Sequence, residues 1–305
     1  MKFHQIYIYS PALWILYFFC CVLFFLNPLY GQAWDSHQLK SILEGTQNYC
    51  EKVKNIALHY ICTERIADKE NILGKRRDFG SRMLMEKQYF KVLRSKRNIY
   101  FYDYQLIRKD DALEEKRILL EENGKKKNKE GVHLSEKLKY SSQYLIFGPV
   151  GFLSRYWQNF FKYEIVGKED VHGESCFVIE AMPTEEREEN YNLGRIWVNP
   201  KNQIVRLECD PLSIQNYKDE KIIGHLAASG HTHRSFAMEF GKKVVWVVDY
   251  GIEKNGVRFP SQQVIKELFV FDSDTQGMKY ETIKRETVFD FIDYKFFVVD
   301  TEIKY

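Results

Sequence analysis

The stretch RIWVNPKNQIVRLE at residues 195–208 indicates the fold, because it holds two apolar runs with turn residues between them. Ile, Val and Trp are typical of strands, and Pro200-Lys201-Asn202 contains residues that favour turns. We therefore expect strands at 193–198 and 203–210, paired as an antiparallel hairpin.

Similar patterns predict strands on both sides of this hairpin. Residues 98–109 and 112–123 flank the two-residue turn Asp110-Asp111 and predict a long second hairpin. Residues 124–142 are polar and rich in lysine, which predicts a loop or a marginal helix. The other expected strands are 56–66, 163–169, 174–181, 234–240, 243–252, 261–271 and a hairpin or bent strand at 286–305.

Two helices are expected. Asp35 is a suitable N-cap, and apolar residues recur at helical spacing from Leu39 to Val53, which predicts about five helical turns. From Pro149 to Phe161, aromatic residues recur on one side and predict a short second helix. The chain is thus mainly β (α+β), with about ten antiparallel strands, and a sheet of that length tends to curl on itself.

The N-terminus has the layout of a secretory signal peptide. A basic residue precedes the apolar run Ala12–Phe25, and Gly31 and Ala33 are the small residues that signal peptidase requires. We expect residues 1–33 to be removed by cleavage after Ala33, leaving 34–305 as a single exported, periplasmic domain. An uncleaved N-terminal membrane anchor is the alternative.

Four cysteines lie beyond this segment. Cys50 on the expected helix and Cys62 on the strand that follows can meet if the helix folds back, so a disulfide between them is a hypothesis. Cys176 and Cys209 fall on strands that a third strand separates, which is too far for a bridge, so we expect buried thiols.

The stretch SGHTHRSF at 229–236 raises the question of a metal site. Its Gly-His-Thr-His run is typical of metallophosphoesterases, and His225 lies close to His231 and His233. A two-metal centre also needs bridging carboxylates, yet the chain contains no Gly-Asp or Gly-Asn dipeptide. A solvated loop is therefore the preferred interpretation, and a metal-dependent hydrolase that uses these histidines is kept as an alternative.

The sequence favours a binding protein over an enzyme. It has no Gly-x-Ser-x-Gly elbow, GxGxxG, P-loop or HExxH motif, so we expect no catalytic residue and no cofactor. The net charge of +3 gives no global field that would favour nucleic acid.

Apolar side chains occupy both faces of several expected strands, such as VVWVVDY at 244–250 and SCFVIEA at 175–181. A strand buried on one face only shows alternation, so these runs indicate that both faces are covered. Because only two helices are expected, we predict an apolar concavity that a ligand fills, with the aromatic helix as its lid; an ordinary packed core is the alternative. The predicted lining residues are Phe177, Ile179, Trp197, Val198, Trp246 and Val248 from strands, and Phe152, Trp157 and Phe160 from the helix.

Several stretches resemble the LolA-like family, whose members are often labelled outer-membrane lipoprotein-sorting proteins. They are YDYQLIRK (102–109), EKRILLEENGK (115–125), GPVGFLSRYWQ (148–158), YEIVGKEDVHG (163–173), RIWVNPKNQIVRLE and DYKFFVVDTEI (293–303). The match is closest to the divergent acidobacterial-type branch and extends from about residue 36 to 305. Residues 211–232 match no motif of the family.

This resemblance implies a curved antiparallel half-barrel, closed by the N-terminal helix and the short aromatic helix. In the carriers of the family an apolar interior holds the acyl chains of a lipoprotein. Arg195 and Arg206 are candidates for the cavity arginine of those carriers. The leading hypothesis is therefore a periplasmic protein that binds a lipid or an acylated lipoprotein, in outer-membrane lipoprotein sorting. The alternative is an envelope scaffold that binds a membrane-protein partner.

Overall fold

Strands account for most of the described fold. The computed structural model describes residues 36–56, 59–74, 91–109, 112–130, 134–140, 145–184, 193–210, 239–273 and 278–297. The fold below is that of the compact unit Leu39–Tyr305. Its strands are β1 (His59–Leu73), β2 (Val92–Lys109), β3 (Ala112–Glu122), β4 (Lys125–Glu130), β5 (Phe161–Val171), β6 (Glu174–Pro183), β7 (Leu193–Val198), β8 (Ile204–Asp210), β9 (Glu239–Asp249), β10 (Ile252–Lys254), β11 (Val257–Phe259), β12 (Gln262–Ser273) and β13 (Met278–Phe296).

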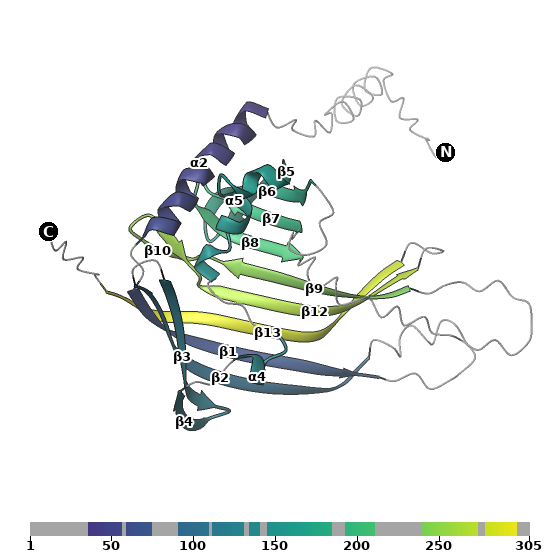
Figure 1. Cartoon of the computed structure of the whole chain (residues 1–305). Coiled ribbons are helices and arrows are strands. Elements are labelled where there is room, and N and C mark those ends of the chain that lie inside the picture. Colours follow the sequence, from purple (N-terminus) through teal and green to yellow (C-terminus); the bar gives the residue numbers. More distant parts are fainter. Residues whose placement is uncertain are drawn as a thin grey trace, which may run out of the picture. The chain divides into compact units, whose positions relative to one another are not determined.

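Eleven of these strands form one antiparallel sheet in the order β4-β3-β2-β1-β13-β12-β9-β8-β7-β6-β5. Neighbours along the chain are mostly neighbours in the sheet, but the last strand, β13, lies between β1 and β12. Figure 1 shows that the sheet is strongly curved along its long central strands. The expected curved antiparallel sheet is therefore confirmed.

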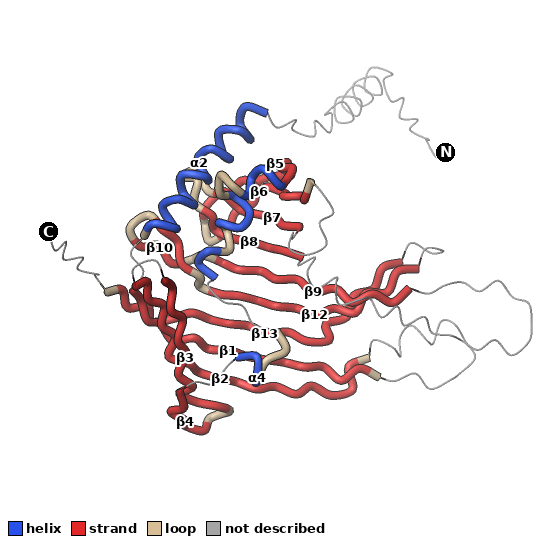
Figure 2. Tube along the Cα trace, viewed as in Figure 1, coloured by secondary structure: helices blue, strands red, loops and turns tan. Residues whose placement is uncertain are grey.

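Helical segments are few, as the sequence predicts. They are α2 (Ser36–Asn55), α4 (Leu134–Lys137), η1 (Leu145–Phe147), α5 (Val150–Leu153) and η2 (Trp157–Phe160). Figure 2 shows α2 and the short turns around α5 beside the part of the sheet that contains β5 to β8. The expected N-terminal helix is confirmed, and its buried side chains Ile42, Thr46, Tyr49, Cys50 and Val53 follow helical spacing.

The expected second helix is wrong as a single element. The chain leaves the helical conformation at Ser154, whose φ of −68° and ψ of 156° are extended. Phe152 and Phe161 explain the break, because their ring centroids lie 5.4 Å apart. Nine residues along one continuous helix would separate them by roughly 13 Å, so packing both rings requires the chain to fold back.

Two tight hairpins were missed at the sequence level, and both turn at Asn-Gly. Asn123-Gly124 joins β3 to β4, and Asn255-Gly256 joins β10 to β11; all four residues have positive φ. These are the residues that a two-residue hairpin turn requires. Residues 124–142 are therefore not a plain loop or marginal helix, since they contain β4 and α4.

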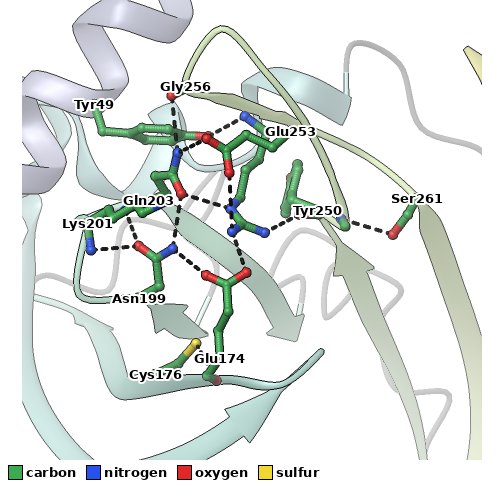
Figure 3. A network of polar contacts seen from close by, with 12 residues as sticks. Tyr49, Glu174, Cys176, Asn199, Lys201, Gln203, Tyr250, Glu253, Gly256 and Ser261 are labelled. Carbon is green, nitrogen blue, oxygen red and sulfur yellow. Dashed lines mark hydrogen bonds and ion pairs between the residues drawn. The ribbon is translucent and has the colours of Figure 1, made fainter.

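Arg258 on β11 ties separate parts of the fold together. Figure 3 shows its partners Tyr49, Glu174, Gln203 and Tyr250 gathered in one polar network. Arg258 is 5% exposed, and its guanidinium donates to Glu174 Oε1 at 2.5 Å, to Gln203 Oε1 at 3.1 Å and to the carbonyl of Tyr250 at 3.3 Å. Its backbone N–H donates to the hydroxyl of Tyr49 on α2 at 3.1 Å. The hairpin β10–β11 thereby fastens α2 to the turns at one end of the sheet.

The four described cysteines are buried free thiols, so the hypothesised Cys50–Cys62 bridge is not formed. Cys50 points at the α5 segment, where its Sγ lies 3.8 Å from the carbonyl oxygen of Pro149. Burial raises the pKa of Cys50 to about 12, which keeps the thiol protonated. Cys176 and Cys209 are buried thiols on β6 and β8, as expected.

Candidate functional site

One face of the sheet lies under the helical segments, and we refer to it as the covered face. Side chains alternate along each strand, so the strand register places Tyr163, Ile196, Val248 and Glu64 on this face. The α5 segment packs here, because the hydroxyl of Tyr163 donates to the carbonyl of Phe152 at 2.5 Å.

Five of the predicted lining residues lie on the covered face. Register places Phe177, Ile179 and Val198 together on β6 and β7, and Trp246 and Val248 on β9. Ile179, Val198 and Val248 are almost fully buried, whereas Phe177 and Trp246 are partly exposed. These two side chains are therefore accessible apolar groups on an otherwise packed face.

Trp197, Arg195 and Arg206 lie on the opposite face. The indole Nε1 of Trp197 donates to Glu169 at 2.8 Å, and the guanidinium of Arg206 lies 5.7 Å from its ring centroid. Arg206 also forms an ion pair with Asp249 at 2.6 Å. Arg195 and Arg206 thus point away from the covered face, and Arg206 is already paired with Asp249 there. Neither arginine is placed as a cavity arginine would be.

The cover over β5 to β8 consists of α2 and the short turns from η1 to η2. Gln158 joins them, since its Nε2 donates to the carbonyl of Leu43 on α2 at 2.9 Å and its Oε1 accepts from Gln47 at 2.7 Å. Tyr250 holds η1 through a 2.9 Å hydrogen bond from its hydroxyl to the carbonyl of Leu145. These polar contacts and the buried side chains of Ile146, Phe152 and Leu153 thus hold the turns from η1 to η2 in place.

Trp157 and Phe160 form an aromatic cluster at the outer end of this cover. Their ring centroids are 5.8 Å apart, and each ring also contacts Tyr156, whose residue is 63% exposed. Phe152 is buried, whereas Trp157 and Phe160 are partly exposed. The predicted lid residues therefore belong to the cover, but only Phe152 reaches the sheet as a buried side chain.

The ring of Phe152 packs directly against the backbone of Gly194. Alanine at this position is expected to lower the free energy of unfolding by about 1–3 kcal/mol. A Cβ there would lie 2.6 Å from Cε1 of Phe152, so the ring and the α5 segment must shift. Urea denaturation of Gly194→Ala checks this, with Gly151→Ala as control because its Cβ meets nothing within 4 Å. Equal stability of Gly194→Ala and the wild type would show that the cover is not seated as described.

A charged band crosses the covered face on the long strands, and it was missed at the sequence level. Its ion pairs are Arg117–Glu64 at 2.6 Å, Arg117–Glu115 at 3.1 Å, Arg285–Asp68 at 2.7 Å and Lys139–Glu267 at 2.8 Å. The signal was present in β1, where Glu64 and Asp68 alternate in phase with Tyr60, Cys62 and Ile66. Charges in phase with an apolar face indicate buried pairing.

Burial and pairing act against each other in this band. Burial raises the pKa of Glu64, which is 0% exposed, and the Arg117 guanidinium offsets this only in part. Burial opposes the charge of Arg117, but Glu64 and Glu115 outweigh it and raise the Arg117 pKa. Both groups of the pair therefore depend on each other to stay charged inside the protein.

Some buried donors on the covered face have no hydrogen-bond partner among the described residues. Among them are the hydroxyl of Tyr102 on β2, beside Glu64 in the register, and the indole Nε1 of Trp246 on β9. Buried donors are normally paired, so each such group calls for an explanation. Four inter-strand spacings separate β2 from β9, which is roughly 19 Å along the sheet.

The histidines of the metal alternative lie outside the described residues, as do residues 1–33 and 211–232. In the part of the chain that the structure describes, no group of three or more His, Cys, Asp or Glu side chains is arranged to hold a metal ion. Of the described helices, none combines the length and the apolar character needed to cross a membrane.

No family model matches the chain, and no curated protein matches it. Several solved structures resemble it in part, and three of them illustrate the likeness. One is an outer membrane lipoprotein-sorting protein domain from Vibrio parahaemolyticus, which is 11% identical to this chain. The match covers 86% of this chain and 93% of the Vibrio chain, with a TM-score of 0.34.

The other two give similar values. A DUF1329 family protein of Desulfovibrio piger is 14% identical over 87% of this chain and 94% of its own, with a TM-score of 0.31. A LolA superfamily protein of Nitrosomonas europaea is 13% identical over 87% of this chain and 96% of its own, with a TM-score of 0.31. The acidobacterial-type branch of the resemblance stays a prediction. The TM-scores are low, so no conclusion about ligand or partner rests on them.

Proposed function

We propose that this chain is an exported, non-enzymatic protein that holds the acyl chains of a lipid or an acylated lipoprotein against the covered face of its sheet. The observation that carries the proposal is the pair of partly exposed apolar side chains, Phe177 and Trp246, on that face. A buried acyl chain gains about 0.8 kcal/mol for each CH₂ group that leaves water. Binding of this kind needs no catalytic group.

The cover is relevant to this function, because its α5 segment consists of short helical turns that a ligand would have to displace or pass. α5 and η2 have only 4 residues each, too short to be stable as isolated helices. Their attachment depends on local contacts such as Gln158 with α2 and Phe152 with Gly194. Displacement of the segment would expose the buried side chains of Ile146, Phe152 and Leu153, so a bound ligand would have to replace these contacts.

The unpaired donors fit an amphipathic ligand. Acyl chains carry ester or amide carbonyls at one end, and such oxygens accept hydrogen bonds from donors like the Tyr102 hydroxyl or the Trp246 indole N–H. A site that offers apolar surface with a small number of oriented donors is typical of lipid and cofactor pockets. We also propose that the protein is periplasmic and acts in outer-membrane lipoprotein sorting.

The proposal predicts that Trp246→Ala weakens binding of a fluorescent fatty acid roughly tenfold, because about 1.5 kcal/mol of apolar contact is lost. Val247→Ala is the matched control, since Val247 is partly exposed on the same strand and points to the opposite face. Binding is measured by titration of the purified protein. Equal losses in both variants would contradict a ligand on the covered face.

Native mass spectrometry tests the function without a chosen probe. The protein is purified from the cells that express it, and acyl-bearing species are expected to co-purify with the wild type and with Val247→Ala, and to be depleted in Trp246→Ala. If the wild type carries no acyl species and binds no fatty acid, the proposal fails. Capture of a membrane-protein partner without any lipid would instead favour the envelope scaffold.

A further inference from the structure

We propose that the far end of the β1–β2 hairpin docks on an anionic lipid surface. This basic tip consists of Lys69 and Ile72 on β1 and of residues 91–97, KVLRSKR, which lead into and begin β2. Register pairs Ile72 with Arg94 and Lys69 with Arg97, and Leu93 lies at a register shift between the strands. The inference is independent of what the covered face binds.

The tip is strongly basic. Every residue from Lys91 to Arg97 is exposed, and this stretch contains four cations and no acidic residue. The nearest acid in the register is Glu70, opposite Lys96, and its Oε1 is 3.4 Å from Nζ of Lys284. Within the described part of the chain, Arg94, Lys96 and Arg97 have no acidic partner. Their positive charge is therefore available to an external anion.

Exposed apolar side chains lie among these cations. Ile72 is 47% exposed, Val92 43% and Leu93 62%, so three neighbouring aliphatic groups face water at the same strand ends. Single exposed aliphatic residues are common, but a cluster ringed by cations is characteristic of surfaces that enter the headgroup region of a bilayer. The cations attract anionic headgroups and the aliphatic groups insert between them.

The combination favours a membrane over nucleic acid or an acidic protein. Nucleic acids are held by phosphate contacts and by aromatic stacking, and the tip has no aromatic side chain among its described residues. Ile72, Val92 and Leu93 would stay in water on a nucleic acid, whereas a lipid surface buries them. An acidic protein would satisfy the charges, and this outcome is separated from lipid binding below.

The position of the tip suits docking. β1 has 15 residues, so its ends are roughly 46 Å apart. The other end of the same hairpin meets α2, where Arg108 donates to the carbonyl of Lys54. A membrane at the tip therefore leaves the α2 end and the cover accessible.

Vesicle flotation tests the proposal with the full chain as it accumulates in expressing cells. Phosphatidylcholine vesicles with and without phosphatidylglycerol are compared, and the readout is the gain in binding that phosphatidylglycerol brings. Any contribution of the N-terminal apolar run is common to all variants and does not depend on lipid charge. Each Lys or Arg near an anionic surface strengthens binding about fivefold. The triple variant Arg94→Gln/Lys96→Gln/Arg97→Gln is therefore expected to reduce the gain in binding from phosphatidylglycerol more than tenfold.

The matched control is Lys125→Gln/Lys126→Gln/Lys129→Gln on β4, which removes three equally exposed cations. It changes the net charge by the same amount and is expected to keep at least half of the gain. Val92→Asn/Leu93→Asn keeps every charge and is expected to lose the part of binding that survives high salt. Circular dichroism melting confirms folding of each variant, and the exposed positions make loss of the fold unexpected.

Three outcomes would overturn the proposal. Equal loss in the two triple variants would mean attraction by net charge alone. Unchanged binding in the tip variant would place the contact elsewhere. Stronger binding to an acidic peptide or a single-stranded RNA than to phosphatidylglycerol vesicles, lost in the tip variant, would assign the tip to that partner.

Discussion

Replacement of Arg117 by methionine is expected to lower the free energy of unfolding by about 3–5 kcal/mol. The arginine side chain is 11% exposed and that of Glu64 is 1% exposed, so the variant leaves a carboxylate inside the protein without its cation. Glu115 loses the same partner, while the Tyr104 hydroxyl still donates to it at 2.6 Å. Chemical denaturation followed by circular dichroism measures the change.

Two further variants separate the buried pair from a general effect of losing an arginine. Glu64→Gln/Arg117→Met removes one of the two carboxylates left without their cation, and it is expected to recover part of the loss. Arg195→Met removes an arginine that is 45% exposed and 3.5 Å from Glu180, and is expected to cost less than about 1 kcal/mol. Similar losses for Arg117→Met and Arg195→Met would contradict a buried role for Arg117.

The charged band bears on function through the same energetics. Buried ion pairs often stabilise a fold no better than apolar groups of equal size would, so stability alone does not explain the band. The pairs involve β1, β3, β12 and β13, where they lie among buried apolar side chains such as Tyr60 and Ile66, whereas β6 to β9 present Ile179, Val198 and Val248. The headgroup of the proposed amphipathic ligand would therefore meet charges away from β6 to β9.

Strands and turns could be predicted from the sequence because they depend on local pattern. The hairpin at 195–208 was found in this way, and the Asn123-Gly124 turn carried the same kind of signal. The position of β13 between β1 and β12 had no local signal, since it depends on pairing across more than 200 residues. Pairing of that kind requires the whole sheet to form.

The candidate site was predicted in part for the same reason. Phe177 and Ile179 are two residues apart and share a face, as alternation requires. Trp197 and Val198 are adjacent, so only one of them can face the cover, and the structure places Val198 there. Whether a buried side chain leaves room for a ligand depends on how the cover packs, which no local pattern determines.

Loss of Arg258 is expected to have an effect as large as that of Arg117, about 3–5 kcal/mol, because its guanidinium supports three separate acceptors. Arg258→Met removes the donor to Glu174 Oε1, to Gln203 Oε1 and to the Tyr250 carbonyl at one end of the sheet. Asn199 still donates to Glu174 Oε2 and to Gln203 Oε1. Arg65→Met is the control, since Arg65 forms a single ion pair with Asp290 at 2.7 Å and is 33% exposed. Its replacement is expected to cost less than about 1 kcal/mol.

The pH dependence distinguishes the loss of this network from a simple packing defect. Burial raises the pKa of Glu174, but hydrogen bonds from Asn199 and Arg258 outweigh it, so the pKa lies below the ordinary value of 4.5. A carboxyl with a lowered pKa stabilises the fold above its unfolded value, and this contribution disappears as the pH falls through the folded value. The wild type is therefore expected to lose stability on acidification below about pH 4.5, and Arg258→Met to lose less. Denaturation curves at neutral and acid pH check this, and a stability difference that stays constant with pH would contradict the ion pair's role. If the stability difference between the wild type and Arg258→Met narrows in acid, the Arg258 network that links α2 to the sheet depends on the charge of Glu174. The attachment of the cover would then be weakest at acid pH.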